Sequence, residues 1–371
     1  MPSWDMRRLK TSTIPSPSRS SERVVCPVPC PIRAVPKKTI RQRAALRMKS
    51  SLVIASGFLF QCAMATALIT HPDCLGHITP PGHAEQVARL DAVLGALEGI
   101  PLERFSAPMA ADGDILRVHP KAHIDYLRRR APESGIATLD PDTFMSPGSL
   151  AAAYRAAGAV VKAVDLVLGG AVQNAFAAIR PPGHHAERET PMGFCLLGNI
   201  AIGAMHALDH HGLKRVAIVD FDVHHGNGTQ DLVQDDPRVL FISSHEMPLY
   251  PGTGDPSDTG KHDNVLNIAL KAGTRSKEFR DIYEAQVFPR LRAFKPDLIL
   301  VSAGFDAHCA DPLANICLET DDFAWVTNRI CDIAGEVCEG RVVSALEGGY
   351  DLEALADSAA AHVKTLQERA A

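Results

Sequence analysis

The sequence has no excess of basic residues beyond its first fifty positions. Residues 1–50 hold 12 of the 38 Lys and Arg residues but only two of the 43 Asp and Glu residues, so the rest carries 26 basic against 41 acidic side chains. Domains that bind nucleic acid neutralise phosphates with clustered Lys and Arg. The acidic balance of residues 51–371 therefore argues against a nucleic-acid-binding enzyme.

The nine cysteines lack a regular pairing pattern. Several of them, such as Cys331 and Cys338, lie within apolar runs. Small disulfide-rich domains instead show evenly paired cysteines, so we expect a reduced compartment rather than a disulfide framework. Cys26 and Cys30 form a C-x3-C pair, but no second pair completes a zinc site.

Large apolar residues are scarce in residues 1–50, which are rich in Pro, Ser, Arg and Lys. Such a segment cannot bury a core. We predict a disordered basic extension over residues 1–63 and one folded domain over residues 64–371.

Charge is absent from residues 51–69, which follow Arg47 and Lys49. Residues 48–65 therefore resemble a signal peptide of an exported protein, and a membrane-spanning helix is also long enough here. We favour a third interpretation, in which residues 65–70 form the first core strand, because ATALIT is a β-rich run that stops at His71-Pro72. This interpretation places the protein in the cytoplasm, with no membrane contact of the folded domain.

Short β-rich runs alternate with helical patterns along the rest of the chain. We expect strands at 65–70, 175–179, 216–219, 238–243, 297–305 and 342–346, and helices at 84–97, 150–168, 278–294, 321–338 and 352–367. The helix at 84–97 reads as a surface helix with Glu85 and Arg89 among its polar positions, and residues 131–148 read as a long loop. The repetition predicts a single-domain α/β fold, a mostly parallel sheet with helices on both faces.

The central run RVAIVDFDVHHGNGTQ, residues 215–230, leads from an apolar strand into Asp220, Asp222 and His224. Side chains alternate along a strand, so we expect these three on one side, where a cation can sit. Taken alone, the segment also fits a strand that runs into a polar loop.

Further polar groups follow other expected strands. They are His184 and His185 in the turn RPPGHHA, Ser243, Asp306 and Tyr350. In parallel α/β sheets, ligands bind outside the carboxyl ends of the strands, so we expect these groups to form one site. By contrast, His206, His210 and His211 read as a polar helix end.

Asp222, His224 and Asp306 form a donor set that suits one zinc ion, because catalytic zinc has three protein ligands and an open position. Zinc would activate water and polarise a carbonyl. Paired histidines can move the protons, and a tyrosine hydroxyl can donate to an oxyanion. This set of groups predicts hydrolysis of an amide.

Seven motifs occur in a defined order: RPPGHHA, GFC at 193–195, DFDVHHGNGTQ, YPGTG at 250–254, SAGFDAH, DPL at 311–313 and LEGGYD. Together they resemble the histone deacetylase superfamily, which has the arginase-like α/β fold. The resemblance runs from about Thr66 to the C-terminus. Asn227 makes it closest to the class II-like and bacterial amidohydrolase branch.

The resemblance implies that Asp222, His224 and Asp306 bind the zinc. It implies that His185 is the general base and proton donor, oriented by Asn227.

It also implies that His184 is an electrostatic partner oriented by Asp220. Tyr350 would be the oxyanion donor.

Substrate contacts follow from the same resemblance. It implies an acyl-lysine tunnel with aromatic walls at Phe194 and Tyr250, and with Gly193, Leu313 and Gly349 as further substrate-binding residues. An acidic rim residue cannot be assigned within 131–148.

The resemblance further implies structural potassium. One site would use Asp220, Asp222, His224, Ser243 and Ser244. Val233, Asp236 and Val239 would lie near a second one, although these residue types are not diagnostic.

The implied activity is hydrolysis of an acetyl or other acyl amide, with acetyl-lysine of a protein or peptide as substrate and acetate as product. Acetylpolyamines or other small acylamines are the alternative substrates, but Leu313 stands where polyamine-preferring members carry an acidic gatekeeper. The sequence leaves open whether the protein forms a homo-oligomer.

Two alternatives concern other activities. An arginase-like ureohydrolase with two manganese ions would want an Asp where Gly226 stands. The other alternative is a non-catalytic module that binds an acyl-lysine or a cofactor. Such a module would not need Tyr350, the paired histidines and the three metal ligands, so their presence argues against it.

Overall fold

The computed structural model describes residues 65–370. The extension predicted for residues 1–63, its signal-like segment and the C-x3-C pair lie outside the described residues. Within 65–370, no helix is both long enough and apolar enough to cross a membrane. The first core strand predicted at 65–70 is confirmed as β1 (Thr66–Thr70).

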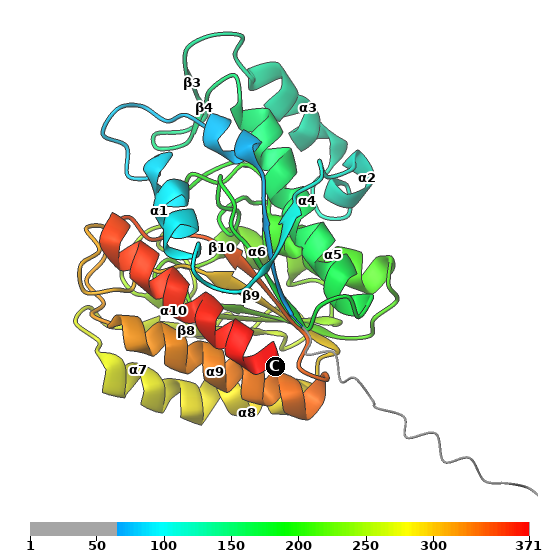
Figure 1. The fold of residues 1–371 in the computed structure, drawn as a ribbon, viewed down its shortest axis with the longest axis vertical. Helices are drawn as coiled ribbons and strands as arrows, with labels where there is room; N and C mark the ends of the chain where they lie inside the picture. The colour runs from blue at the N-terminus through cyan, green and yellow to red at the C-terminus, as the bar shows by residue number, and fades with distance from the viewer. Residues whose placement is uncertain (1–64, 371) are drawn as a thin grey trace, which may run out of the picture. The chain divides into compact units, whose positions relative to one another are not determined.

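Eight parallel strands form the central sheet, in the order β2-β1-β5-β10-β9-β6-β7-β8 (Figure 1). Besides β1, they are β2 (Glu103–Ser106), β5 (Asn174–Ala177), β6 (Val216–Asp220), β7 (Val239–Glu246), β8 (Val265–Leu270), β9 (Leu298–Ala303) and β10 (Val342–Leu346). All six residues of β9, LILVSA, are buried. Such continuous apolar runs are typical of parallel strands covered on both faces.

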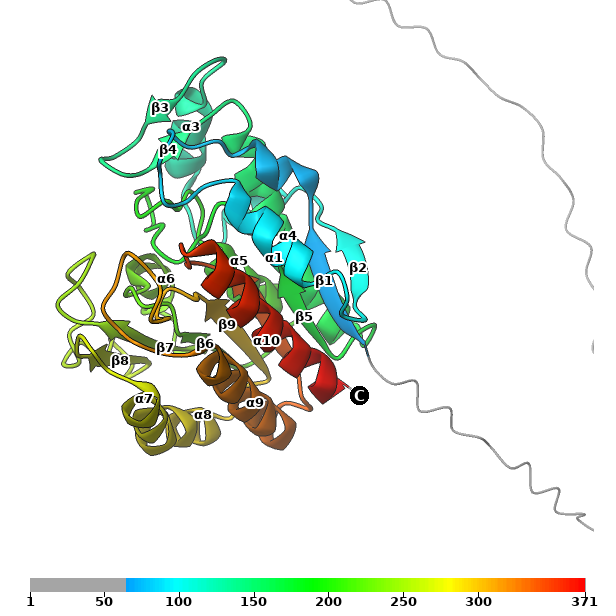
Figure 2. The same ribbon diagram turned by 60° about the vertical axis from the view of Figure 1, so that its left-hand side comes forward.

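Helices cover both faces of this sheet, with α9 and α10 on one face and α4 and α5 on the other (Figures 1 and 2). The α-helices are α1 (Ala88–Ala96), α2 (Asp112–Ile115), α3 (Lys121–Arg130), α4 (Ser149–Leu168), α5 (Asn199–Asp209), α6 (Asn227–Val233), α7 (Ser276–Ile282), α8 (Phe288–Phe294), α9 (Thr320–Val337) and α10 (Leu352–Ala370). A 3-10 turn, η1 (Pro72–Gly76), and a π turn, η2 (Tyr283–Val287), complete them. The predicted α/β fold is confirmed.

Several differences from the predicted elements concern the sheet and the site. Strand β6 ends at Asp220, so Asp222 and His224 lie in the bend after it and strand alternation does not explain their orientation. The predicted loop at 131–148 contains a short antiparallel pair, β3 (Ala137–Thr138) and β4 (Phe144–Met145). Both edge strands, β2 and β8, were missed; the mostly exposed ERFS of β2 carries no apolar run.

The cysteine prediction is correct only in part. Among the described residues, Cys74, Cys195, Cys331 and Cys338 are free and buried. Cys309 and Cys317 form a disulfide in the loop between β9 and α9, so the expectation of reduced cysteines is wrong for this pair. Backbone hydrogen bonds between residues 307–309 and Leu318 bring the two cysteines together, a contact that their spacing does not reveal.

The sheet order positions the site. Strands β5, β10, β9 and β6 are consecutive neighbours, and parallel strands end at the same edge. The segments after them carry His184 and His185, Tyr350, Asp306 and Asp222, respectively. Groups far apart in the sequence therefore meet at one edge of the sheet.

Candidate active site

Asp222, His224 and Asp306 come together at this edge. Their ligand atoms lie within 4.8 Å of one another, and all three residues are buried. His224 Nδ1 lies 3.1 Å from Asp222 Oδ1 and 3.2 Å from Asp306 Oδ2. Within residues 65–370, the ion-pair partners of these carboxylates are histidines rather than Lys or Arg. Buried carboxylates in this arrangement are costly unless a cation neutralises them.

The two buried carboxylates of this cluster stabilise a positive charge placed between them. Burial lowers the pKa of His224, but hydrogen bonds with Asp222 and Asp306 outweigh it and raise that pKa to about 10. Burial and the charge of Asp222 raise the pKa of Asp306. Two carboxylates and an imidazole are donors that zinc accepts. The cluster therefore fits a catalytic zinc ion in both charge and donor type.

Backbone groups hold the two carboxylates in place. The N–H of Gly348 donates to Asp222 Oδ2 at 2.8 Å, and the N–H of Val223 donates to Asp306 Oδ1 at 2.9 Å. A β-carbon at position 348 would collide with both carboxylates, so only glycine fits there.

His184 and His185 lie side by side, with ring centroids 4.0 Å apart. His184 Nδ1 is 3.0 Å from Asp220 Oδ2, and His185 Nδ1 is 2.7 Å from Asn227 Oδ1. The amide nitrogen of Asn227 donates to Glu187 at 2.8 Å, which assigns its oxygen as the atom facing His185. His185 Nδ1 therefore carries a proton, and its Nε2 is left free to accept one.

The two histidines differ in charge. Burial, together with the charges of His184 and His224, lowers the pKa of His185 well below its usual value. Burial also acts on His184, but Asp222 and Asp220 outweigh it and raise the pKa of His184 well above its usual value. A neutral imidazole can accept a proton, and a cationic imidazole beside it can stabilise negative charge. This pair can therefore divide the roles of base and electrostatic partner.

Tyr350 is held from several directions. Its N–H donates to Asp311 Oδ2 at 2.7 Å. The Arg89 guanidinium lies 4.9 Å from the centre of its ring and donates to the carbonyl oxygens of Gly349 and Glu347, both at 2.6 Å. Burial raises the pKa of Tyr350 well above its usual value, so its hydroxyl stays protonated as a donor.

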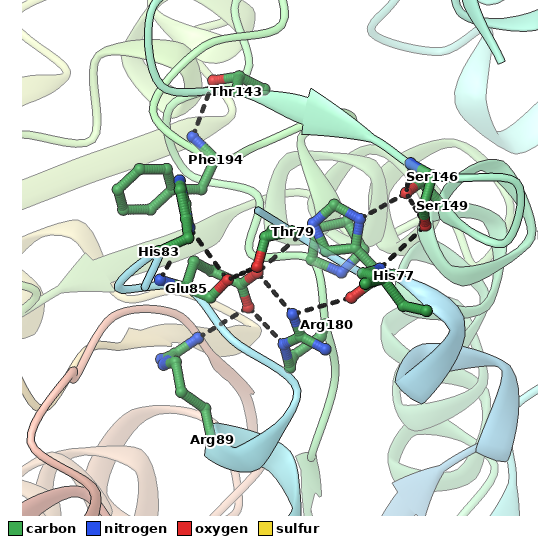
Figure 3. Close-up of polar contacts among 12 residues, drawn as sticks. His77, Thr79, His83, Glu85, Arg89, Thr143, Ser146, Ser149, Arg180 and Phe194 are labelled. Atoms are coloured by element: carbon green, nitrogen blue, oxygen red, sulfur yellow. Dashed lines mark hydrogen bonds and ion pairs between the residues drawn. The ribbon is translucent and has the colours of Figure 1, made fainter. Parts of the chain in front are cut away.

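A buried ion-pair cluster anchors Arg89 in turn (Figure 3). Glu85 lies between two guanidinium groups, accepting from Arg89 Nη1 at 3.3 Å and from Arg180 Nη2 at 2.7 Å. Burial raises the pKa of Glu85, but Arg180 and His77 outweigh it and hold that pKa well below its usual value. The predicted surface helix at 84–97 is wrong for both residues, because α1 begins only at Ala88, after Glu85, and because Glu85 and Arg89 are fully buried.

A pocket opens onto this cluster. Its lining residues are Asp142, His185, Gly193, Phe194, His224, Leu249, Tyr250, Leu313 and Tyr350. The Phe194 ring stands edge-on to Tyr350 at 5.8 Å, and the Tyr250 ring stands edge-on to His185 at 5.2 Å. Gly349 is not among the lining residues; its carbonyl faces Arg89 instead. The other four residues predicted to contact substrate do line the pocket.

Comparison with known proteins decides the family. The model of the histone deacetylase domain family matches residues 83–366. This chain belongs to the histone deacetylase family. It is therefore a hydrolase of acyl amides, which sets aside the ureohydrolase and the non-catalytic module.

Individual relatives are similar over most of their own length. The deacetylase-family chain is 45% identical to the uncharacterized protein slr0245 of Synechocystis sp., over 81% of this chain and 99% of that protein. It is 40% identical to Histone deacetylase 14, chloroplastic, of Arabidopsis thaliana, over 82% of this chain and 78% of that protein. The solved HDA15 HD domain superposes with a TM-score of 0.78 at 32% identity, covering 82% of this chain and 89% of that structure.

Asp142 is a pocket residue of this histone deacetylase-family protein that the sequence did not reveal. Thr143 Oγ1 donates to its carboxylate at 3.0 Å, and burial and Asp140 raise its pKa. Residues 139–143, LDPDT, offer two similar aspartates, and only the turn between β3 and β4 selects the one that faces the pocket.

The residues named for potassium are also neighbours in this histone deacetylase-family protein. Asp220 pairs with Ser243 across β6 and β7. The hydroxyls of Ser243 and Ser244 lie 3.0 Å from His245 Nδ1 and 2.7 Å from the Tyr283 hydroxyl, respectively. Val233, Asp236 and Val239, named for the second site, form the turn that links α6 to β7.

Proposed function

We propose that this protein is a zinc-dependent deacylase that hydrolyses acetyl-lysine in proteins or peptides and releases acetate. The observation that carries the proposal is the buried cluster of Asp222, His224 and Asp306, opening to a pocket beside Phe194 and Tyr350. These three residues would hold the zinc. When bound, zinc supplies a Lewis acid that polarises the acyl carbonyl and activates water.

The protein's own groups would move the protons. His185 accepts the proton of the attacking water at Nε2, because Nδ1 is committed to Asn227. It then delivers that proton to the amine nitrogen as the C–N bond breaks, which yields the carboxylate and the free amine. His184, held cationic beside Asp220, stabilises negative charge in this step.

Tyr350 would stabilise the oxyanion. Its hydroxyl donates to the carbonyl oxygen as negative charge develops there, and removal of such a donor typically costs two to three orders of magnitude in rate. The contacts of Arg89 with Gly349 and Glu347 support this role because they fix the backbone on the N-terminal side of the tyrosine.

An acyl-lysine fits the pocket in shape and polarity. Phe194 and Tyr250 offer flat apolar faces along which a methylene chain can lie. Leu313 and Tyr250 are 37% and 38% exposed, so they reach the mouth of the pocket. The Asp142 carboxylate there can accept a hydrogen bond from a peptide N–H or attract an ammonium group. A small acylated amine is the alternative substrate.

We also propose structural potassium and a cytoplasmic location. The juxtaposition of Asp220 with Ser243 supports a potassium ion near the active site. The uncharged segment at 51–69 runs into the fold, because residues 66–70 form a core strand between β2 and β5. This favours the cytoplasmic location over a signal peptide.

The test is an assay panel of acetyl-lysine peptides, longer acyl-lysines and acetylpolyamines, with metal-free and zinc-reloaded protein. We expect no acetate release without metal, and release from the acetyl-lysine peptide once zinc is restored. Turnover that is unaffected by metal removal would reject the proposal.

A further inference from the structure

A second cluster of metal-binding side chains lies where α4 and α5 end. Asp165 is in the last turn of α4 and His206 is in the last turn of α5. His210 follows one turn later, with its ring stacked 4.7 Å from that of His206, and His211 comes next. One ligand atom from each of these four residues lies within 4.8 Å of the others. The sequence suggested only a polar helix end because it does not show that Asp165 joins the histidines.

His206 faces a carboxylate with each of its ring nitrogens. Nδ1 lies 3.2 Å from Asp114 Oδ1, and Nε2 lies 2.8 Å from Asp165 Oδ1. A neutral imidazole can donate through one nitrogen only. With Nδ1 donating to Asp114, the lone pair of Nε2 is available to a cation, and Asp165 Oδ1 lies close enough to share that cation.

His211 brings another imidazole nitrogen to the same carboxylate oxygen. Its Nε2 also lies 2.8 Å from Asp165 Oδ1, so one carboxylate oxygen faces two imidazole nitrogens. A metal ion shared by these atoms accepts all of their lone pairs. The Asp114 carboxylate then takes the role of the outer partner that orients a metal-bound histidine.

We propose that Asp165, His206, His210 and His211 bind a divalent transition-metal ion of the zinc class. Three imidazoles and one carboxylate suit zinc, cobalt, nickel or copper, whereas calcium and magnesium prefer oxygen donors. The bound ion links the end of α4 to the end of α5. It stabilises the folded protein because it binds the folded chain and not the separated helices.

This site is separate from the catalytic cluster. His211 precedes the amino end of β6, whereas Asp222 follows its carboxyl end. The strand between them has five residues and is therefore roughly 16 Å long at about 3.3 Å per residue, so the two sites lie beyond its opposite ends. Loss of one metal therefore leaves the ligands of the other intact.

The test is calorimetric titration of the metal-free full chain with zinc alone, repeated with cobalt to record its absorption spectrum. Asp306→Ala removes one ligand of the proposed catalytic site, so metal bound by that variant reports the second site. His210→Ala/His211→Ala removes two ligands near the surface, and the exposed His262→Ala is the matched control.

We expect wild type and the control to bind two zinc ions, and Asp306→Ala to bind one. Addition of His210→Ala/His211→Ala to Asp306→Ala should weaken the remaining site by more than about 100-fold, since outer partners alone contribute 10- to 100-fold. Zinc should raise the melting temperature of Asp306→Ala but not that of the triple variant. No zinc bound by Asp306→Ala, or undiminished binding by the triple variant, would overturn the proposal.

Discussion

The Arg89 guanidinium lies over the Tyr350 ring and also donates to the carbonyl oxygens of Gly349 and Glu347. One buried side chain thus fixes both the ring of the tyrosine and the backbone that precedes it. The planar guanidinium makes these contacts with several donors in a fixed fork, which a lysine ammonium cannot reproduce. We therefore expect Arg89 to position the tyrosine hydroxyl.

The substitution Arg89→Lys tests this relationship. We expect kcat to fall about 10- to 100-fold, because a displacement of about 1 Å at a reacting group costs up to about 100-fold. KM should change little, since Arg89 does not line the pocket. The surface substitution Arg128→Lys, which alters an ion pair with Asp112, is the control and should leave both constants unchanged. Steady-state kinetics on folded protein decide it, and a wild-type kcat for Arg89→Lys would refute the positioning role.

The substitution Tyr350→Phe removes the hydroxyl and keeps the ring. Turnover should fall roughly 100- to 1000-fold, the usual cost of losing one oxyanion donor. Zinc content should equal that of wild type, because the hydroxyl belongs to no proposed ligand. If turnover stays near normal, the oxyanion is stabilised by other groups.

The clustering of the candidate site residues could be predicted because they follow buried strands in short, distinctive motifs. Asp222, His224 and Asp306 lie just beyond β6 and β9, and a parallel sheet brings such positions to one edge. The orientation of Asp222 was attributed to strand alternation, but β6 has already ended at Asp220.

Residues whose role depends on distant partners could not be predicted. Glu85 and Arg89 look like surface charges until Arg180 and the Glu347 carbonyl are placed beside them. Asp142 is one of two similar aspartates in a turn, and Cys309 pairs with Cys317 only because the backbone folds back between them. These tertiary contacts cannot be predicted from the neighbouring residues in the sequence.

Substrate choice is tested at the pocket mouth. We expect an acetyl-lysine peptide to have a higher kcat/KM than acetylspermidine or N-acetylputrescine, because Leu313 offers no charge to a second ammonium. The Asp142 carboxylate was not part of that sequence argument and adds an acceptor for either substrate.

Leu313→Glu should shift the kcat/KM ratio toward the polyamine by at least about tenfold, which corresponds to 1.4 kcal/mol. Asp142→Asn should raise KM for the peptide and leave zinc content unchanged. A wild-type preference for acetylpolyamine would overturn the gatekeeper argument.

Acid stability is tested at His362, which is buried between Thr327 at 2.6 Å and Ser344 at 2.8 Å. Burial lowers its pKa to about 3. The unfolded chain binds a proton there near pH 6.5 while the folded chain does not, so stability falls as pH drops below 6.5. From pH 6.5 to 5, this one group should cost about 2 kcal/mol.

Urea unfolding at several pH values measures this slope. His362→Gln should be less stable than wild type at pH 7 but should lose about 2 kcal/mol less between pH 6.5 and 5. The exposed His262→Gln should keep the wild-type slope. Equal slopes for His362→Gln and wild type would show that His362 is not the group responsible.

Asp222, His224 and Asp306 are proposed to hold the zinc ion that hydrolysis of an acyl amide requires. The most direct measurement is acetate release from an acetyl-lysine peptide by metal-free protein as zinc is added, with bound zinc recorded in parallel. Wild type should regain turnover with zinc, Asp306→Ala should bind one zinc ion fewer and stay inactive, and His185→Ala should bind as much zinc as wild type yet stay inactive. Wild-type acetate release by Asp306→Ala, or release by metal-free wild type, would contradict the account.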